Sequence, residues 1–445
     1  MATVRWLGTA TAVNQISTAT PANVEIGDVF NLLVGGVTIA TFTASAATVA
    51  NVTAGLTAAW NASSHPYATG ITASDQATLV RLTADSAGVP FTVTSSTTDG
   101  GGANTQTLTM ATTTANAGPN VWTTATNWSG GSVPTNSDIV IFENNAVPVF
   151  FGLDQSGVTL TELRILQSYT GQIGLPETKF LTTLTGNFAN YDTSKTEYRD
   201  TYLKVGASAL NIGQSVGYLP QAGATRIKVN LGSVEAVVSV YDSCISSADE
   251  PLQPVRLLGT HAGNDLTVYK GTVGVATSTG SEVSTFANTQ QAGGNLTFGK
   301  GVTWTTISKT GGTASINSVG TTLVNSGGDV SYNAASGTAT KIVNKDGTAN
   351  LSGAFAITEL DAFGGTTTLD LGTVITNVVI DGGTLDCSAS SQSPTFSDCE
   401  IRPGGGQLVL NRGVTLSTGI SYDLTGSSGG LAGSYARMKA VFTST

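Results

Sequence analysis

The segment Gly347-Thr-Ala-Asn-Leu351 is one of seven between residues 294 and 410 that open with a glycine and place an apolar residue four positions later. The other six are Gly294-Asn-Leu-Thr-Phe298, Gly312-Thr-Ala-Ser-Ile316, Gly328-Asp-Val-Ser-Tyr332, Gly365-Thr-Thr-Thr-Leu369, Gly383-Thr-Leu-Asp-Cys387 and Gly406-Gln-Leu-Val-Leu410. Successive glycines lie 18, 16, 19, 18, 18 and 23 residues apart. Five positions before a glycine stand Ile307, Leu323, Ile342, Leu360, Val378 and Ile401, and only the first unit differs, with Thr289. Each unit is therefore typical of a strand, a glycine turn and a second strand with alternating burial.

A fixed period of about 18 residues with β character in every unit predicts a β-solenoid. Apolar pairs mark a third side of the coil: Val302 and Trp304, Phe355 and Ile357, Val374 and Ile375, Val414 and Leu416. A β-sandwich rich in glycine turns also has short strands at intervals, but it gives no reason for a constant offset from glycine. We therefore expect an all-β chain in which residues 261–416 form a right-handed β-helix of about 18 residues per coil. Ile342, Leu360 and Val378 should then stack one above another.

The composition fits a β-protein with polar outer faces and argues against several functions. Charged residues make up 11% of the 445-residue chain, and the net charge is −10 at pH 7. Nucleic acids and anionic membranes bind basic surfaces, so neither partner is expected. The chain contains no apolar run of the length that spans a membrane, so no membrane insertion is expected. Its first residues also lack the apolar region of a signal peptide.

The chain has 3 cysteines, which is too few for a disulfide framework. Cys387 and Cys399 are close enough in sequence to approach each other on neighbouring coils, and Cys244 stands alone. Because no spacing typical of metal ligands occurs, we interpret all three as small buried hydrophobic residues and expect no metal or cofactor.

Residues 1–118 are predicted to form a separate β-sandwich module with one helix. Two apolar runs around Gly35-Gly36, residues 29–34 and 37–42, are typical of a β-hairpin. The helix is expected from about Ala46 to Asn61, with one apolar stripe and an end before His65-Pro66. The stripe consists of Val49, Val52, Leu56 and Trp60.

This module resembles one that recurs in bacteriophage structural proteins. The shared residues are Gly27-Asp-Val-Phe-Asn-Leu, the Thr-rich strand, the Ala-rich helix ending in Asn61-Ala-Ser, and Leu82-Thr-Ala-Asp-Ser-Ala-Gly-Val-Pro-Phe91. The resemblance covers about a quarter of the chain and implies a virion part with no active site attached to the module. A particle protein released by cell lysis needs no export signal, which agrees with the N-terminus.

A second pattern begins at Val121 with Trp122-Thr-Thr-Ala-Thr-Asn-Trp-Ser-Gly-Gly-Ser-Val-Pro134. It resembles the Asn-Trp-Ser-Gly-Gly-x-x-Pro element that opens many bacterial and phage β-helix proteins. A solenoid end exposes an edge that must be covered, and two tryptophans beside a glycine turn are suited to plugging it. The alternative is that Trp122 and Trp128 form an aromatic platform that stacks on the sugar rings of a glycan.

The rest of the chain divides by charge. Residues 119–260 are predicted to form the cap and irregular early coils with charged side loops, of which Gly186–Asp200 would protrude. From Thr272 to Thr340 the only charged residues are Glu282, Lys300, Lys309 and Asp329. Packing three rods about one axis would bury so uncharged a face, so we predict a homotrimer. Residues 417–445, with the Gly426–Gly433 loop, would form a C-terminal cap or contact arm.

The sequence contains few candidate catalytic residues. Glycoside hydrolysis uses two facing carboxylates, and Asp370 and Asp386 are the candidate pair on adjacent coils. Aspartates beside turns more often hydrogen-bond their own backbone, so we favour a role in turn formation for both residues over catalysis. With His65 and His261 as the 2 histidines, a histidine-based nucleophile triad is not expected.

These observations favour a non-enzymatic structural protein of a bacteriophage particle. The module would anchor it to other virion proteins, and the rod would project as a trimeric fibre, spike or capsid decoration that aids attachment to host surface glycans. The alternatives are a polysaccharide-depolymerising tailspike and a bacterial cell-surface adhesin.

Overall fold

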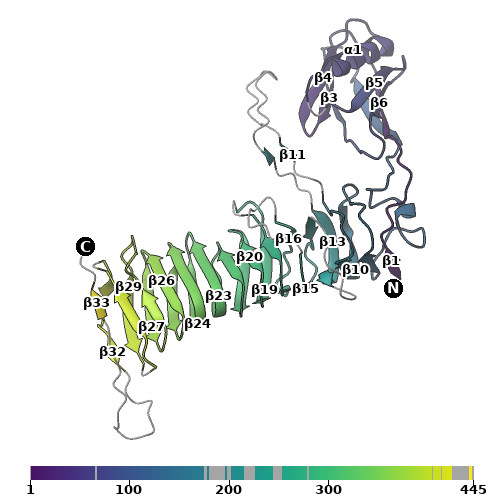
Figure 1. Cartoon of the computed structure of the whole chain (residues 1–445). Helices are drawn as coiled ribbons and strands as arrows, with labels where there is room; N and C mark the ends of the chain where they lie inside the picture. The colour runs from purple at the N-terminus through teal and green to yellow at the C-terminus, as the bar shows by residue number, and fades with distance from the viewer. Residues whose placement is uncertain are drawn as a thin grey trace.

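The computed structural model describes residues 2–65, 68–174, 178–179, 196–197, 202–214, 226–243, 253–277, 280–402, 404–411, 413–422 and 440–442. The protein is 53% strand and 4% helix. Figure 1 shows a module near the N-terminal end and a rod of stacked strands that runs to the C-terminal end. The predicted loop Gly186–Asp200, apart from two residues of a short strand, lies outside the described residues, as do Cys244 and Gly426–Gly433.

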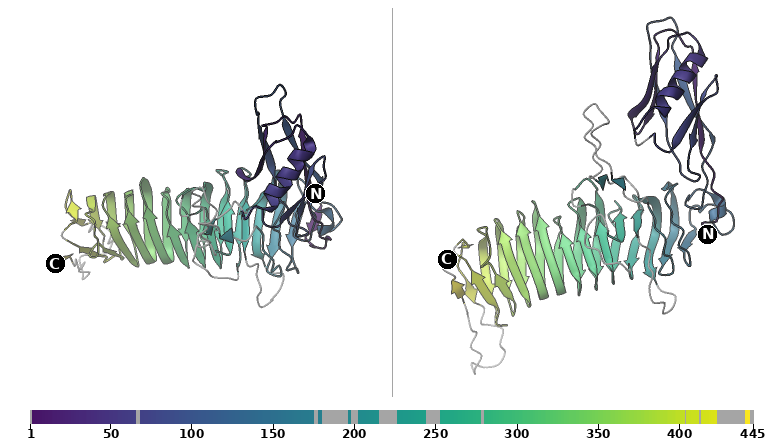
Figure 2. Two further views of the ribbon diagram at one scale, coloured as in Figure 1. Left: turned by 90° about the horizontal axis from the view of Figure 1, so that it is seen from above. Right: turned by 45° about the horizontal axis from the view of Figure 1, so that its top comes forward.

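The rod is a β-solenoid of about 12 turns with a spacing of roughly 19 residues, which confirms the predicted fold class. Parallel strands about 4.8 Å apart make a rod of this many turns about 55 Å long. Both views in Figure 2 show the strands stacked along one axis. The strands of its first side are β1 (Thr3–Arg5), β9 (Ile139–Phe142), β10 (Asp154–Leu166), β13 (Leu203–Gln214), β15 (Val237–Val240), β17 (Asp265–Val268), β19 (Ser284–Gln291), β21 (Val302–Lys309), β23 (Thr322–Ala334), β24 (Thr338–Gly353), β25 (Ala356–Ala362), β27 (Val374–Ile380), β29 (Thr395–Ile401) and β32 (Ser421–Tyr422).

The second side follows each glycine turn, and the third side is the N-terminal part of several first-side strands. The second-side strands are β14 (Ile227–Asn230), β16 (Val255–Leu258), β18 (Thr272–Val275), β20 (Asn295–Phe298), β22 (Thr313–Ile316), β26 (Thr366–Leu371), β28 (Thr384–Asp386), β30 (Gln407–Leu410) and β33 (Ala440–Phe442), with the C-terminal parts of β23 and β24. On the third side Ile357 pairs with Ile375, and β31 (Thr415–Leu416) pairs with β29. The apolar pairs predicted there are inward-facing at Trp304 and Ile375, whereas Val374 is exposed.

One column of buried side chains runs through the first side. Ile342 is in register with Leu360, and Leu360 with Val378, so the predicted stacking is confirmed. The whole column is Val4, Val140, Leu163, Leu210, Val238, Leu266, Thr289, Ile307, Leu323, Ile342, Leu360, Val378 and Cys399. Stacking like residues in this way buries apolar area continuously along the rod.

The last coil departs from the five-residue offset between the buried column and the glycine. Cys399, not Ile401, continues the column beyond Val378. The turn before Gly406 is longer than the other turns, because Thr384 pairs with Gln407 at an offset larger than that of Val378 and Cys399. Counting back from the glycine therefore reaches a different inward-facing position.

The glycine turns stack on one another. Gly271, Gly294, Gly312, Gly328, Gly347 and Gly365 all have positive φ angles, between 59° and 87°. A Cβ added to Gly347 would collide with the carbonyl oxygen of Gly328 in the coil before, and the same holds down the series. Glycine is therefore needed for both its backbone conformation and its lack of a side chain. Gly271 belongs to this ladder although it was not among the seven segments read from the sequence.

A second inward column contains a polar run, which we call the polar column: Gln291, Lys309, Asn325 and Asn344. All four side chains are buried. They donate hydrogen bonds to carbonyl groups at the glycine turns: Gln291 to Gly294 at 3.0 Å, Lys309 to Gly327 at 2.6 Å and Asn325 to Asp346 at 2.8 Å. The polar column therefore satisfies turn carbonyls that face the interior.

Lys309 is the member of the polar column whose burial destabilises the folded protein, because its side chain is charged. Burial lowers the pKa of Lys309 to about 8, although the charge of Asp329 acts in the opposite direction. Because the unfolded chain keeps the ordinary lysine pKa, it binds more protons than the folded protein between pH 8 and 10.5, and stability should rise with pH there. The penalty is fully present below pH 8 and amounts to about 3 kcal/mol.

We expect Lys309→Met to raise the free energy of unfolding at pH 7 by about 2 kcal/mol, because part of the gain is offset by the lost hydrogen bond. The variant should also lose the rise in stability between pH 8 and 10. Denaturant unfolding at pH 7, 8, 9 and 10 measures both effects. The exposed Lys300→Met is the matched control and should change neither; equal pH profiles for the wild type and Lys309→Met would contradict the prediction.

The N-terminal module consists of a four-stranded sheet, a three-stranded sheet and one helix, as predicted from the sequence. Its elements are β2 (Ile16–Ala22), β3 (Val29–Val34), β4 (Val37–Thr43), α1 (Val49–Asn61), β5 (Ile71–Asp75), β6 (Val80–Ala84), β7 (Thr94–Thr98) and β8 (Thr107–Thr114). The side chain of Thr48 caps α1, and Val52, Leu56 and Trp60 face the module core. The helix begins three residues later than predicted, directly after this cap, and ends at Asn61 as predicted.

The first residues belong to the rod and not to the module. Thr3–Arg5 pairs with Ile139–Ile141, and Trp6 lies in the core of the solenoid. The module core spans Ala19 to Leu108, so the module is inserted between the first strand of the rod and the rest. The boundary at residue 1 is corrected accordingly. Local pattern could not reveal it, because the partner strand of Thr3–Arg5 is distant in the chain.

Candidate functional site

Trp122 and Trp128 lie inside the N-terminal end of the rod. Their relative exposures are 0% and 1%, and their ring centroids are 4.6 Å apart. Trp128 also packs against Trp6 at 4.9 Å and against Phe142 at 6.0 Å, in edge-to-face geometry. The tryptophans therefore plug the solenoid end, and the alternative of an aromatic platform for sugars is wrong, because neither ring has an open face. Trp6 completes the plug and was missed in the sequence.

The residue before Trp128 explains the Asn-Trp pair. The Asn127 side chain is fully buried, and its amide donates to the carbonyls of Gly118 and Val121 at 2.7 and 2.8 Å. Its oxygen accepts from the N–H of Ala10 at 2.8 Å. One side chain thereby joins the two segments that connect the module to the rod.

Asp370 and Asp386 lie at diagonal positions on adjacent coils, because Asp386 pairs with Thr368, two residues before Asp370, but each carboxylate is hydrogen-bonded to different local partners. Asp386 is held in its own turn, where its carboxylate accepts a hydrogen bond from the N–H of Ser388 at 2.8 Å. Asp370 accepts from the N–H and hydroxyl of Ser391 at 2.9 and 3.0 Å. Asp370 lines a surface groove to which Asp386 contributes nothing.

This groove lies where the second side turns into the third. It has a volume of about 410 Å³ and is lined by Ala335, Gly353, Ala354, Asp370, Gly372, Thr373 and Gln392. Its size falls within the range of small-ligand sites. A floor of glycine and alanine leaves room for a flat ligand, and the Asp370 carboxylate can accept hydrogen bonds from neighbouring hydroxyl groups. Since one carboxylate lines it, the groove suits binding of a hydroxylated ligand better than two-carboxylate hydrolysis.

Gln392 and Thr373 were missed as members of this groove. Gln392 lies in the coil that takes 21 residues between Val378 and Cys399, where other coils nearby take 18. That local lengthening was the available signal, because added residues in a solenoid coil form a surface loop.

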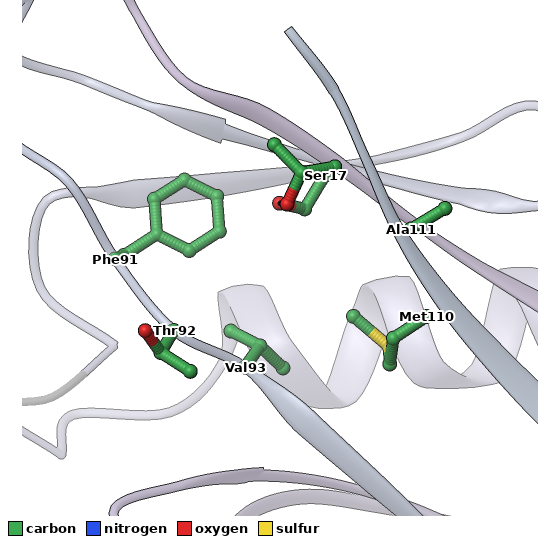
Figure 3. Close-up of a pocket in the computed structure, with 7 residues that line it drawn as sticks. Ser17, Phe91, Thr92, Val93, Met110 and Ala111 are labelled. Atoms are coloured by element: carbon green, nitrogen blue, oxygen red, sulfur yellow. The ribbon is translucent and has the colours of Figure 1, made fainter. Parts of the chain in front are cut away.

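A second, smaller pocket lies in the module. Figure 3 shows the side chains around it: Ser17, Phe91, Thr92, Val93, Met110 and Ala111. Its volume is about 140 Å³, the size of a cavity that holds a benzene ring. It is therefore too small for an oligosaccharide, and it includes Phe91 from the run that resembles the phage module.

Lys341 is held by ion pairs, and the two described cysteines of the rod are buried. Lys341 contacts Glu359 at 2.6 Å and Asp361 at 2.9 Å, and these hydrogen bonds raise the pKa of Lys341. Cys387 and Cys399 are free and buried, as predicted, and burial raises the pKa of each thiol to about 12. Within the described ranges, no three His, Cys, Asp or Glu side chains cluster closely enough to hold a metal ion.

The described part of the chain contains no helix long and apolar enough to cross a membrane. Comparisons with family models, curated proteins and solved structures gave no match to this chain.

Proposed function

We propose that the protein is a non-enzymatic structural component of a bacteriophage virion, made in the host cytoplasm and carried as a trimeric fibre, spike or head decoration. In this proposal the N-terminal module attaches to other virion proteins and the rod meets the host surface. The support from the sequence is the resemblance of the module and of the Asn-Trp element to phage proteins. The support from the structure is the outer surface of the rod.

The observation that carries the proposal is a pair of outward-facing polar ladders on the second side. The first consists of Asn295, Thr313, Asp329, Thr348, Thr366 and Thr384. The second consists of Thr297, Ser315, Ser331, Asn350, Thr368 and Asp386. Such repeated hydroxyl and amide groups form weak hydrogen bonds to glycan hydroxyls many times over, and multivalency turns weak contacts into attachment.

The low charge of the stretch from Thr272 to Thr340 supports the trimer. Lys309 is buried, so from Thr272 to Thr340 the charges that remain on the surface are Glu282, Lys300 and Asp329. Three rods about one axis would bury one side of this stretch with cyclic symmetry and leave its other sides exposed. Light scattering at micromolar concentration is expected to give three times the mass of the chain, and a monomer mass would contradict the trimer.

Electron microscopy of particles that carry a labelled copy tests the virion assignment. We expect label at a fixed position on every particle; label only on the surface of uninfected bacteria would favour the adhesin alternative. Incubation with host capsule or lipopolysaccharide separates attachment from depolymerisation. We expect the polysaccharide to be bound with its chain length unchanged, whereas shortened chains that persist with the wild type and disappear with Asp370→Asn would favour the tailspike alternative.

A further inference from the structure

Two tyrosines stack on the outside of the rod. Tyr241 follows β15 and Tyr269 follows β17, and their ring centroids are 5.1 Å apart with planes at 9°. Their N–H groups donate to the carbonyls of Ile212 and Val240 in the preceding coils, at 2.8 and 2.9 Å. The two rings therefore occupy the same position in successive coils and lie one over the other along the rod axis.

The stack ends at Tyr269 because the next coils have small residues at this position. Ala292 donates to the carbonyl of Val268, and Thr310 donates to that of Gln291, both at 2.8 Å. Ala292 and Thr310 are exposed, and Tyr269 is 47% exposed. At Gly293 an added Cβ would lie 2.7 Å from the carbonyl oxygen of Tyr269, so this position cannot carry a side chain. The ring face of Tyr269 that points away from Tyr241 is therefore not covered by the small residues of the next coils.

Polar groups lie beside this uncovered ring face of Tyr269. Lys270 forms an ion pair with Asp242 at 3.0 Å, and both residues adjoin the tyrosines in sequence. Thr310 is exposed, and its hydroxyl, which donates to the carbonyl of Gln291 at 3.5 Å, can still accept a hydrogen bond from a ligand. An open aromatic face with hydrogen-bonding groups at its edge is complementary to a pyranose, which has an apolar C–H face and a rim of hydroxyl groups.

We propose that the step formed by Tyr269, Ala292 and Thr310 binds a pyranose ring of a surface polysaccharide, with the sugar stacked on Tyr269. This inference rests on the proposed role in glycan attachment and names its site. It differs from the groove at Asp370, which lies several coils nearer the C-terminal end and has no aromatic residue in its lining.

The test is saturation-transfer NMR on the full chain with three soluble probes: cellotetraose, chitotetraose and lactose. We expect the wild type to bind at least one of them through ring C–H protons. Tyr269→Ala should weaken that binding by about tenfold or more, which corresponds to about 1.4 kcal/mol of lost stacking. Tyr269→Phe keeps the ring and should bind within about twofold of the wild type.

Ala292→Tyr makes the test independent of folding defects. It should extend the stack by one coil, leave the thermal midpoint unchanged or higher, and still abolish binding, because the added ring covers Tyr269. If the wild type, Tyr269→Ala and Ala292→Tyr bind the probe equally, the proposed site at Tyr269 is wrong. The proposed glycan attachment by the rod would be unaffected by that result. Binding of no probe by the wild type also overturns it, as does a smaller oligomer for Ala292→Tyr in light scattering, because the open face would then be a contact between copies. The particle microscopy described above is unaffected by any of these results.

Discussion

Gly347→Ala is expected to destabilise the solenoid by about 4 kcal/mol, through two effects that act together. At φ 77° an alanine is strained by about 1–2 kcal/mol. The added Cβ would also collide with the carbonyl oxygen of Gly328, which is backbone and cannot move aside without disturbing the adjacent coil. The midpoint of guanidinium unfolding, followed by far-ultraviolet circular dichroism, measures the loss.

Gly232→Ala is the matched control for this substitution. Gly232 also has a positive φ, of 62°, but nothing lies within 4 Å of an added Cβ. It should therefore show the conformational penalty alone, about 1–2 kcal/mol. Equal losses for the two variants would mean that contact between stacked glycine turns does not limit stability.

Trp128→Ala is the second substitution with a large expected effect, also about 4 kcal/mol, because it empties the centre of the aromatic plug. Trp128 is 1% exposed and contacts Trp6, Trp122 and Phe142. Each coil of a solenoid contacts only its neighbours, so the damage should stay near the N-terminal end. Hydrogen exchange measured by mass spectrometry should accelerate in β9 and β10 and remain unchanged in β26 and β27.

Trp304→Ala provides the comparison, since it deletes the same side chain from the middle of the rod, where Trp304 is 3% exposed. Faster exchange is then expected in β19, β21 and β23 and not in β9. If both variants accelerate exchange along the whole rod, the solenoid unfolds as one cooperative unit and the local role of the plug is wrong.

The regular coils were predictable because two constraints repeat in each of them. The turn needs glycine, as at Gly347, and the residues on either side must fill the interior, as Ile342 and Leu351 do. Both constraints are local and leave a period in the sequence. The early coils lack this period because their turns use other residues. Ser243, for example, occupies the position next to Gly271 in the preceding coil, where later coils have glycine.

Other features depend on contacts that no local pattern encodes. Alternation places Lys309 and Asn325 inward, but their polar side chains argue for an outward position, and only the turn carbonyls they bond resolve the conflict. The tryptophans posed a similar choice. An exposed platform and a buried plug use the same residue type, and the strand that brings Trp6 to the plug decided between them.

The insertion of the module after the first strand has a consequence for the order of folding during synthesis. Thr3 must wait for Ile139 to leave the ribosome, which takes roughly ten seconds at ordinary rates of synthesis. A chain of that length would close slowly if it stayed unfolded. The module shortens the distance, because the bridge between Val13 and Ala117 brings its entry and exit together. The folded module therefore shortens the effective loop that must close when Thr3–Arg5 pairs with Ile139–Ile141.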